Sequence, residues 1–338
     1  MAKERSGPKI VVIGGGTGLS TMLRGLKRCA EDITAVVTVA DDGGGSGMLR
    51  QDLGMPPPGD VRNCIQALAN TEPTMERLLA YRFTEGVLKG QSFGNLFLAA
   101  LNGMSETFDE AVRRMSDVLA ITGRVLPVTN ESVYLAADFD DGTEVLGESL
   151  IAEFKKGTDK RIERVRLVPP HPQALDEVLE AIGEADMIVL GPGSLYTSIM
   201  PNLLCAGVAE AVANSDAFRI YVLNIMTQDG ETEGYTASDH IGAIFSNSGR
   251  RLFDWCLANS GEIPPEVREK LRPRGRGARG GGRAGRAGAG RGAHLRPRGR
   301  LAQRRYPPRP GCAGGRAAAR LQGEVAHQGV RISATAHT

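Results

Sequence analysis

The sequence predicts an α/β protein in which a doubly wound, mostly parallel sheet carries a small β-hairpin insert. Residues 10–13, 34–39 and 186–190 are apolar runs dominated by aliphatic and β-branched residues, which is typical of strands that are buried on both faces. A glycine-rich or acidic loop follows each run. This order is typical of sheets that bind ligands at the carboxyl ends of their strands.

The first glycine loop lies between the run 10–13 and a helix predicted from the spacing of Leu19, Met22, Leu23 and Leu26. Unpaired N–H groups at a helix start bind anions. The loop lacks the third glycine of the dinucleotide fingerprint and the Lys-Ser/Thr pair of a P-loop. A tight turn without a ligand is therefore the alternative to a phosphate site. The residues expected to bind phosphate are Gly14, Gly15, Gly16, Thr17 and Gly18.

The second loop places two carboxylates side by side after the run 34–39. A doubly wound sheet has an acid at this point that binds a ribose hydroxyl, and a neighbouring carboxylate suits a hard cation such as Mg²⁺. A solvated Asp-Gly turn is the alternative interpretation. The candidate ligand residues are Asp41, Asp42, Gly43 and Gly44, with Asp41 or Asp42 as the magnesium ligand.

A proline-rich break at residues 56–58 precedes another predicted helix. We expect Asp60 to cap this helix, with Arg62 and Asn63 in its first turn. A cation near a helix start opposes the helix dipole, so Arg62 indicates a bound anion, unless it is an ordinary surface arginine. All three residues are candidates for the ligand site.

The third apolar run, 186–190, enters a Gly-Pro-Gly-Ser loop and a short predicted helix. Ser194 and Thr197 are expected to donate hydrogen bonds to phosphate oxygens, or else to cap that helix. Asn224 and Thr227 follow a further predicted strand at 218–223 and suit a base or a sugar.

A small insert is expected at about residues 130–150. Residues 133–137 and 143–146 read as two strands around the turn 140–142. A strand at 163–168 and a crossover helix at 172–182 then lead into the second half of the sheet.

A series of motifs occurs in this order: residues 14–18, 41–47, 57–63, 92–96, 124–129 and 191–198. Over residues 9–270 the series resembles the bacterial gluconeogenesis factor family (YvcK), which is related to 2-phospho-L-lactate transferase (CofD). The resemblance implies a cytoplasmic, Rossmann-like protein that binds a UDP-sugar. It also implies a regulatory role in growth on gluconeogenic carbon sources and in cell shape and wall synthesis.

The resemblance adds further residues to the expected ligand site. In the related transferase branch, Mg²⁺ assists phospholactyl transfer, and Asp41 matches the acid expected near that metal. A Mg²⁺-dependent phosphotransferase is therefore the alternative function. Gly45, Met48 and Gln91 stand where a serine, an arginine and a histidine are usual, which weakens the expectation of transfer activity. The added ligand residues are Ser92, Gly94, Asn95, Gly191, Gly193, Ser194, Tyr196 and Thr197.

Two enzyme classes compete with these interpretations. Residues 90–94 match the G-x-S-x-G nucleophile elbow, and Asp186 and His240 follow in the order of an α/β-hydrolase. However, residues 84–89 make a poor strand, and His240 is expected on a helix surface. A nicotinamide-dependent oxidoreductase would explain the order of strand, glycines and acid but not the missing third glycine.

The composition limits the cellular locations that we expect for the protein. The chain has 338 residues and five cysteines, without CxxC spacing. We expect a cytoplasmic protein with no secretion signal and no membrane span. The sequence leaves open whether the chain forms a homo-oligomer.

Charge divides the chain at about residue 270. Residues 271–338 contain 16 arginines, no lysine and one acid, Glu324, whereas residues 1–270 contain 25 basic and 38 acidic residues. A disordered arginine-glycine arm that binds nucleic acid is one interpretation. Out-of-frame translation of a GC-rich gene is the interpretation we favour, because the resemblance ends there. Residues 1–270 would then form the nucleotide-binding domain, with an exposed sheet edge.

Overall fold

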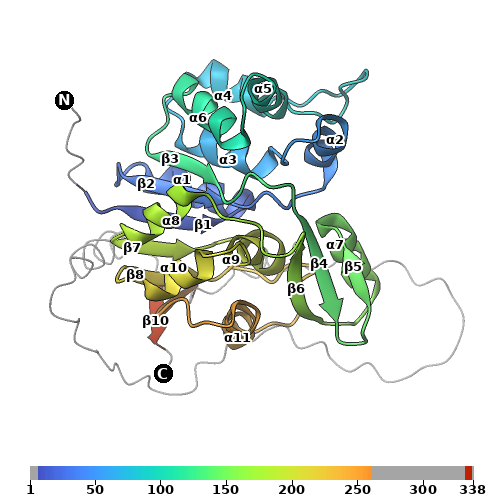
Figure 1. The fold of residues 1–338 in the computed structure, drawn as a ribbon, viewed down its shortest axis with the longest axis vertical. Helices are drawn as coiled ribbons and strands as arrows, with labels where there is room; N and C mark the ends of the chain where they lie inside the picture. Colours follow the sequence, from blue (N-terminus) through green and yellow to red (C-terminus); the bar gives the residue numbers. More distant parts are fainter. Residues whose placement is uncertain (1–6, 260–331, 337–338) are drawn as a thin grey trace, which may run out of the picture.

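The computed structural model describes residues 7–259 and 332–336. Within them, a seven-stranded sheet forms the centre of the molecule (Figure 1). Six of its strands are parallel, and the seventh, β10, is antiparallel to its neighbour. In spatial order the strands are β3 (Arg124–Pro127), β2 (Ile33–Val37), β1 (Ile10–Gly14), β7 (Met187–Leu190), β8 (Phe218–Val222), β9 (Trp255–Asn259) and β10 (Ile332–Ala336).

The strand order reverses direction at β1. The chain builds outward through β2 and β3 on one side of β1, and through β7, β8 and β9 on the other side. This is the strand order of a doubly wound dinucleotide-binding sheet, in which ligands bind in the crevice at the reversal point. The predicted fold class is therefore confirmed, and the carboxyl ends of β1 and β7 are the place to look for a site.

Helices flank the sheet. In Figure 1, α8 and α10 lie in front of the strands, and α2 to α6 gather beside β3. The helices of the main unit are α1 (Gly16–Leu26), α2 (Gly44–Leu53), α3 (Gly59–Leu68), α4 (Pro73–Ala80), α5 (Phe93–Asn102), α6 (Phe108–Val118), α8 (Asp176–Gly183), α9 (Met200–Leu203), α10 (Val208–Asn214) and α11 (Ala237–Ser248). One turn of π-helix, η1 (Leu195–Ile199), leads directly into α9.

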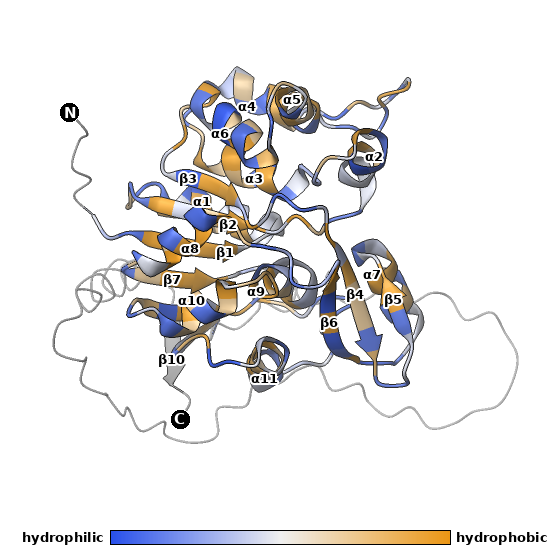
Figure 2. Cartoon of the chain, in the orientation of Figure 1, coloured by the Kyte–Doolittle hydropathy of each residue, from blue (hydrophilic) through white to orange (hydrophobic). Residues whose placement is uncertain are grey.

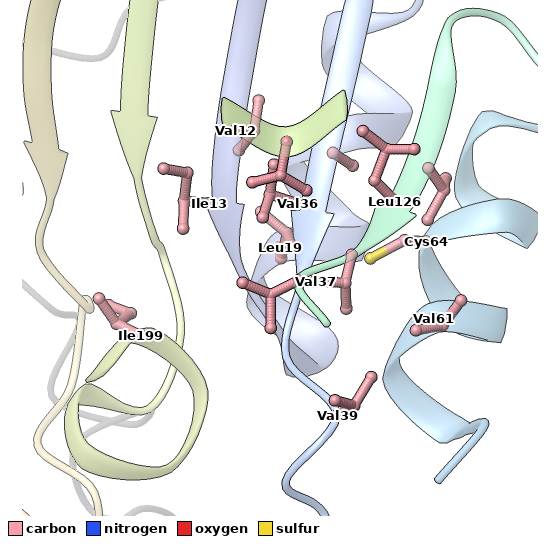
Figure 3. Packing of buried hydrophobic residues seen from close by; sticks show 14 of the residues in the cluster. Val12, Ile13, Leu19, Val36, Val37, Val39, Val61, Cys64, Leu126 and Ile199 are labelled. Atoms are coloured by element: carbon pink, nitrogen blue, oxygen red, sulfur yellow. The ribbon is translucent and has the colours of Figure 1, made fainter. Parts of the chain in front are cut away.

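The hydrophobic core lies between the central strands and these helices. Figure 3 shows Val12 and Val36, from adjacent strands, close to Leu19 of α1 and to Val61 and Cys64 of α3, and all five side chains are buried. Hydropathy follows the same division, because the strands are largely apolar while the helices carry polar residues on their outer sides (Figure 2). Burying this apolar surface holds the glycine loops at the strand ends in place.

A second, three-stranded sheet lies beyond the carboxyl ends of the parallel strands (Figure 1). The predicted hairpin is present, since β4 (Tyr134–Phe139) and β5 (Glu144–Leu146) pair antiparallel. The unit extends past the expected hairpin, because β6 (Ile162–Val168) pairs with the other edge of β4. Helix α7 (Glu148–Gly157) connects β5 to β6.

Residues 332–336 are the only described part of the arginine-rich segment. They form β10, which pairs with β9 in a register that runs from Ile332 opposite Asn259 to Ala336 opposite Trp255. The rest of the predicted tail, 271–331 and 337–338, lies outside the described residues. In the described part of the chain, β10 therefore lies on the outer side of β9.

Three local expectations need correction. Helix α3 begins at Gly59 with Pro58 as its N-cap, so Asp60 lies in the first turn and is not the cap. The acidic glycine loop is shorter than expected, because α2 starts at Gly44. His240 is buried in α11 and not on its surface.

No helix among the described residues is long and apolar enough to cross a membrane.

Candidate functional site

Two glycine loops touch at the reversal point of the sheet. A Cβ on Gly18 would lie 3.0 Å from the carbonyl oxygen of Pro192, and a Cβ on Gly193 would lie 3.1 Å from that of Gly15. Gly16 has a φ of +70°, which other residues rarely adopt. We call residues 14–18 and 191–193 together the glycine cradle. The two backbones pack so closely that a side chain at Gly18 or Gly193 would push the loops apart.

Two amide side chains, the buried Asn202 and the half-buried Asn224, hold the cradle together. Asn202 donates from Nδ2 to the carbonyl oxygens of Gly14, at 3.1 Å, and Ser198, at 2.8 Å. Asn224 makes two bonds with Gly193, accepting from its N–H at 3.1 Å and donating to its carbonyl oxygen at 2.8 Å. Asn224, expected to contact a base or sugar, is thus used to position the loop. Sequence reasoning missed Asn202, whose bonds depend on contacts that no local pattern reveals.

Acidic side chains line the β1 side of the cradle. A Cβ on Gly15 would lie only 2.5 Å from Oδ2 of Asp60, and the Asp60 carboxyl accepts a hydrogen bond from the N–H of Gly16. Burial and then the negative charge of Asp41 raise the pKa of Asp60 to about 6. The carboxyl group of Asp60 therefore already sits where an anion would meet the start of α1.

Glu148, the first residue of α7, brings a third acid to this place. Burial, followed by the charges of Asp41 and Asp60, raises the pKa of Glu148 to about 9. Its carboxyl also hydrogen-bonds the side chains of Asp41 and Thr197. Sequence reasoning missed Glu148, because only the docking of the small sheet brings α7 to the end of β2.

The neighbours Asp41 and Asp42 have different surroundings. Asp41 accepts from the N–H of Gly43 at 2.9 Å through Oδ1, while its Oδ2 lies 3.2 Å from the position of a Cβ on Gly59. Asp42 points to the small sheet and accepts from the N–H of Ser149 in α7 at 2.8 Å. The two carboxylates, either of which was predicted to hold a magnesium ion, thus face different elements.

The residues around Asp41 offer limited support for a metal ion. Among the described residues, no group of three or more His, Cys, Asp or Glu side chains has a metal-binding arrangement. Mg²⁺ commonly uses only one or two carboxylates and completes its shell with water and substrate phosphates. Asp41 beside the cradle fits that mode, with Glu148 as the adjacent carboxyl group.

The loop before η1 was also predicted to bind phosphate. Side chains of the protein occupy its hydrogen-bonding groups instead. The N–H of Thr197 donates to Oε1 of Glu231 at 3.0 Å, and Glu231 is only 2% exposed. Burial raises the pKa of this carboxyl group to about 7. Ser194 donates to Gln228 at 2.7 Å, and the Tyr196 hydroxyl lies 3.0 Å from that of Tyr235. The polar groups at the start of η1 are therefore engaged within the fold.

Other expected site residues gather where α3 meets the start of α5. Arg62 donates from Nε to Oδ1 of Asn95 at 3.1 Å, and a Cβ on Gly94 would lie 2.8 Å from Cδ of Arg62. Ser92 is the N-cap of α5, and its hydroxyl accepts from the Asn95 N–H. Asp60 and Arg62 lie two residues apart on α3, and the positive charge of Arg62 partly offsets the rise in the pKa of Asp60. Asn63 lies on α3, and Thr227 lies in an exposed loop after β8.

The hydrolase interpretation finds no assembled triad. Ser92 caps α5 and follows no strand. His240 pairs through Nδ1 with the Tyr221 hydroxyl at 3.1 Å, and Asp186 accepts from the backbone N–H of Lys9 at 2.8 Å. Each of the three residues is engaged with a different partner, so they do not form a nucleophile relay.

The strand order and the cradle at its reversal point define a Rossmann-like α/β protein. A family model described as 2-phospho-L-lactate transferase CofD matches residues 10–278. This chain belongs to that family. The family match ends at residue 278, within the arginine-rich segment that begins at residue 271.

Similar proteins within this family carry the name gluconeogenesis factor. The gluconeogenesis factor of Bacillus subtilis is 50% identical over 264 residues, which cover 78% of this chain and 82% of that protein. A Thermoanaerobacterium thermosulfurigenes relative is 59% identical over 267 residues, 79% of this chain and 82% of that protein. A crystal structure of a Bacillus halodurans protein, 50% identical, superposes with a TM-score of 0.75 and covers 78% of this chain and 84% of that one.

Proposed function

We propose that this protein is a cytoplasmic gluconeogenesis factor that binds a UDP-sugar in the glycine cradle. The proposal includes a regulatory role in growth on gluconeogenic carbon sources and in cell shape and wall synthesis. The observation that carries it is the contact between the two glycine loops at the reversal point of the sheet, in a chain whose relatives include a gluconeogenesis factor. Glycine backbone at such a point gives a diphosphate close access to N–H groups.

The start of α1 is the expected diphosphate contact. Its N-cap, Gly15, has no capping side chain, and the Asp60 carboxyl on Gly16 must move or share this position when an anion binds. Mg²⁺ held by Asp41 would supply positive charge between the phosphates and these carboxylates. Within the protein, Asn202 and Asn224 keep the loops in position for the ligand.

A Mg²⁺-dependent phosphotransferase is the second candidate, because the family model that matches is that of a phospholactate transferase. The same cradle and Asp41 would serve both functions. The difference lies in the fate of the ligand, since a regulator releases the nucleotide intact and a transferase consumes its donor. Analysis of the nucleotide by NMR after long incubation with the protein and Mg²⁺ separates the two.

Isothermal titration of the full chain tests the binding proposal. UDP-N-acetylglucosamine is titrated with and without Mg²⁺, and UDP, NAD and GDP are titrated in parallel. We expect saturable binding of the UDP-sugar, weaker binding of NAD and GDP, and recovery of the UDP-sugar intact. No binding of any UDP compound would overturn the proposal, and turnover of a nucleotide would favour the transferase.

The adjacent acids provide a matched pair of variants. Asp41→Asn is expected to remove the effect of Mg²⁺ on UDP-sugar binding, because it removes the carboxylate beside the cradle. Asp42→Asn should leave that effect intact, because an amide oxygen can still accept from Ser149. The reverse outcome would place the metal on Asp42 and contradict the assignment.

A further inference from the structure

Gln91 is a buried side chain whose acceptor atom has no partner. Only 4% of the residue is exposed, and its Oε1 makes no hydrogen bond to any described residue. Native proteins keep few buried oxygens without a donor, because each one has lost its hydrogen bonds to water. A donor from outside the chain would therefore be stabilising at Gln91.

The unpaired oxygen faces the first turn of α2. It lies 2.9 Å from the position of a Cβ on Gly45, and the carbonyl oxygen of Gly90 lies 3.3 Å from the same position. Because Gly45 has no side chain, Oε1 of Gln91 can lie directly against the helix backbone. Gly44 is exposed and Gly45 is half-buried, so the start of α2 can be reached from solvent.

The same turn offers backbone donors. Helix α2 has ten residues, and its N-cap, Gly43, makes no side-chain hydrogen bond to it. The N–H of Gly47 donates to the carbonyl oxygen of Gly43 at 3.0 Å, and the N–H groups before Gly47 have no partner within the helix, as at other helix starts. The oxygen of Gln91 thus places an acceptor beside a row of donors.

The start of α2 adjoins the acidic side of the glycine cradle. Oγ of Ser46 would clash with a Cβ on Gly59, and Oδ2 of Asp41 lies 3.2 Å from the same Cβ position. A ligand held in the cradle can therefore extend toward α2. The Asp41 carboxylate disfavours a second anion there, whereas an uncharged hydroxyl group can donate to Gln91 and accept from a helix N–H.

We propose that Gln91 and the first turn of α2 form the subsite for the sugar of the bound nucleotide-sugar. Oε1 of Gln91 accepts from a sugar hydroxyl, and a helix N–H donates to the sugar. Rotation about the last torsion of Gln91, which has a broad range, turns the carboxamide toward the ligand. This inference rests on the proposed UDP-sugar binding and identifies the residue that distinguishes the sugar nucleotide from UDP.

Isothermal titration of the full chain with UDP-N-acetylglucosamine and with UDP tests the subsite. Gln91→Met keeps the length of the side chain and removes the carboxamide. The variant should bind UDP-N-acetylglucosamine about tenfold more weakly than wild type does and bind UDP equally well. Gln51→Met, at an exposed position of the same helix α2, is the control and should change neither affinity.

A second pair of variants tests the geometry without altering Gln91. Gly45→Ala places a Cβ 2.9 Å from Oε1 of Gln91, so it should also weaken binding of UDP-N-acetylglucosamine and leave that of UDP unchanged. Gly25→Ala has nothing within 4 Å of its Cβ and should bind both compounds as wild type does.

Stability separates a ligand-binding role of Gln91 from a structural one. Removing a carboxamide that has no internal partner should leave the urea midpoint unchanged or raise it. The subsite is overturned if Gln91→Met binds UDP-N-acetylglucosamine as wild type does, if it loses stability and both affinities together, or if wild type binds UDP equally tightly. Failure of wild type to bind either compound would instead overturn the proposed function.

Discussion

The starts of α1 and η1 look alike in sequence but differ in the fold. Each follows a buried strand and a glycine loop. At each start, a side-chain carboxyl group accepts a hydrogen bond from a backbone N–H. At α1 the acid is Asp60, partly exposed beside the cradle, whereas at η1 it is Glu231, only 2% exposed. A strand, glycine and helix pattern therefore marks a place that stabilises negative charge, but it does not tell whether a ligand or the protein supplies that charge.

The location of each acid determines whether a substitution there should change ligand binding or stability. Asp60 lies at the reversal point, next to Asp41 and the glycine loops, where a ligand can replace or accompany it. Glu231 connects the segment before α11 to η1 over 34 residues and lies inside the fold. We expect changes at the α1 start to act mainly on ligand binding, and changes at Glu231 to act mainly on stability.

The largest effect is expected from filling the α1 start. Gly15→Ala puts a Cβ 2.5 Å from the Asp60 carboxylate and 2.8 Å from Thr38. We expect a loss of about 2 to 3 kcal/mol in the free energy of unfolding and a loss of UDP-sugar binding of about a hundredfold or more. Urea unfolding and isothermal titration measure the two effects.

Gly25→Ala is the control on the same helix. Nothing lies within 4 Å of a Cβ at Gly25, so alanine should stabilise α1 by about 0.5 to 1 kcal/mol and leave ligand binding unchanged. Equal losses in the two variants would mean that the cradle does not depend on close packing at Gly15.

Glu231 should make stability depend on pH. Its folded pKa of about 7 exceeds its ordinary value of 4.5, so the folded protein binds the proton more tightly than the unfolded chain does. The stability from this group is therefore fully present below about pH 4.5, is lost as pH rises to about 7, and stays low above that. Over this pH range, Glu231 lowers the free energy of unfolding by about 3 kcal/mol.

Glu231→Gln should remove this dependence, because the amide stays neutral and its oxygen can still accept from Thr197. The measurement is urea unfolding at several pH values between 5 and 8. We expect the free energy of unfolding of the variant to exceed that of wild type most at pH 8. Glu163→Gln, an exposed position on β6, provides the control. Parallel stability curves for Glu231→Gln and wild type would contradict a buried, proton-binding Glu231.

The smallest effect on ligand binding is expected at Asp60, the acid at the start of α1. Asp60→Asn removes a negative charge from the Gly16 N–H, so a diphosphate should bind about tenfold more tightly in the absence of Mg²⁺. The gain should shrink when Mg²⁺ is present. Isothermal titration measures both, and weaker binding without Mg²⁺ would instead show that Asp60 contacts the ligand as an acceptor.

Much of the fold could be predicted because local patterns report it. The apolar run at 10–13 and the spacing of Leu19 and Leu23 predicted β1 and α1, and the cap at Ser92 marks the start of α5. Prediction was weaker at α3, where a proline and not Asp60 is the cap. Of the candidate site, the glycine loops were found and they meet at the reversal point, while Asn202, Glu148 and Glu231 were missed.

The sequence by itself determined that buried parallel strands end in glycine turns, since hydrophobic periodicity and glycine act over a few residues. Only the tertiary structure decided which side chains meet at those turns. Asp42 reaches Ser149, 107 residues away, while its neighbour Asp41 stays at the cradle. The physical reason is that adjacent residues point in different directions, and the partners of each depend on which distant elements dock there.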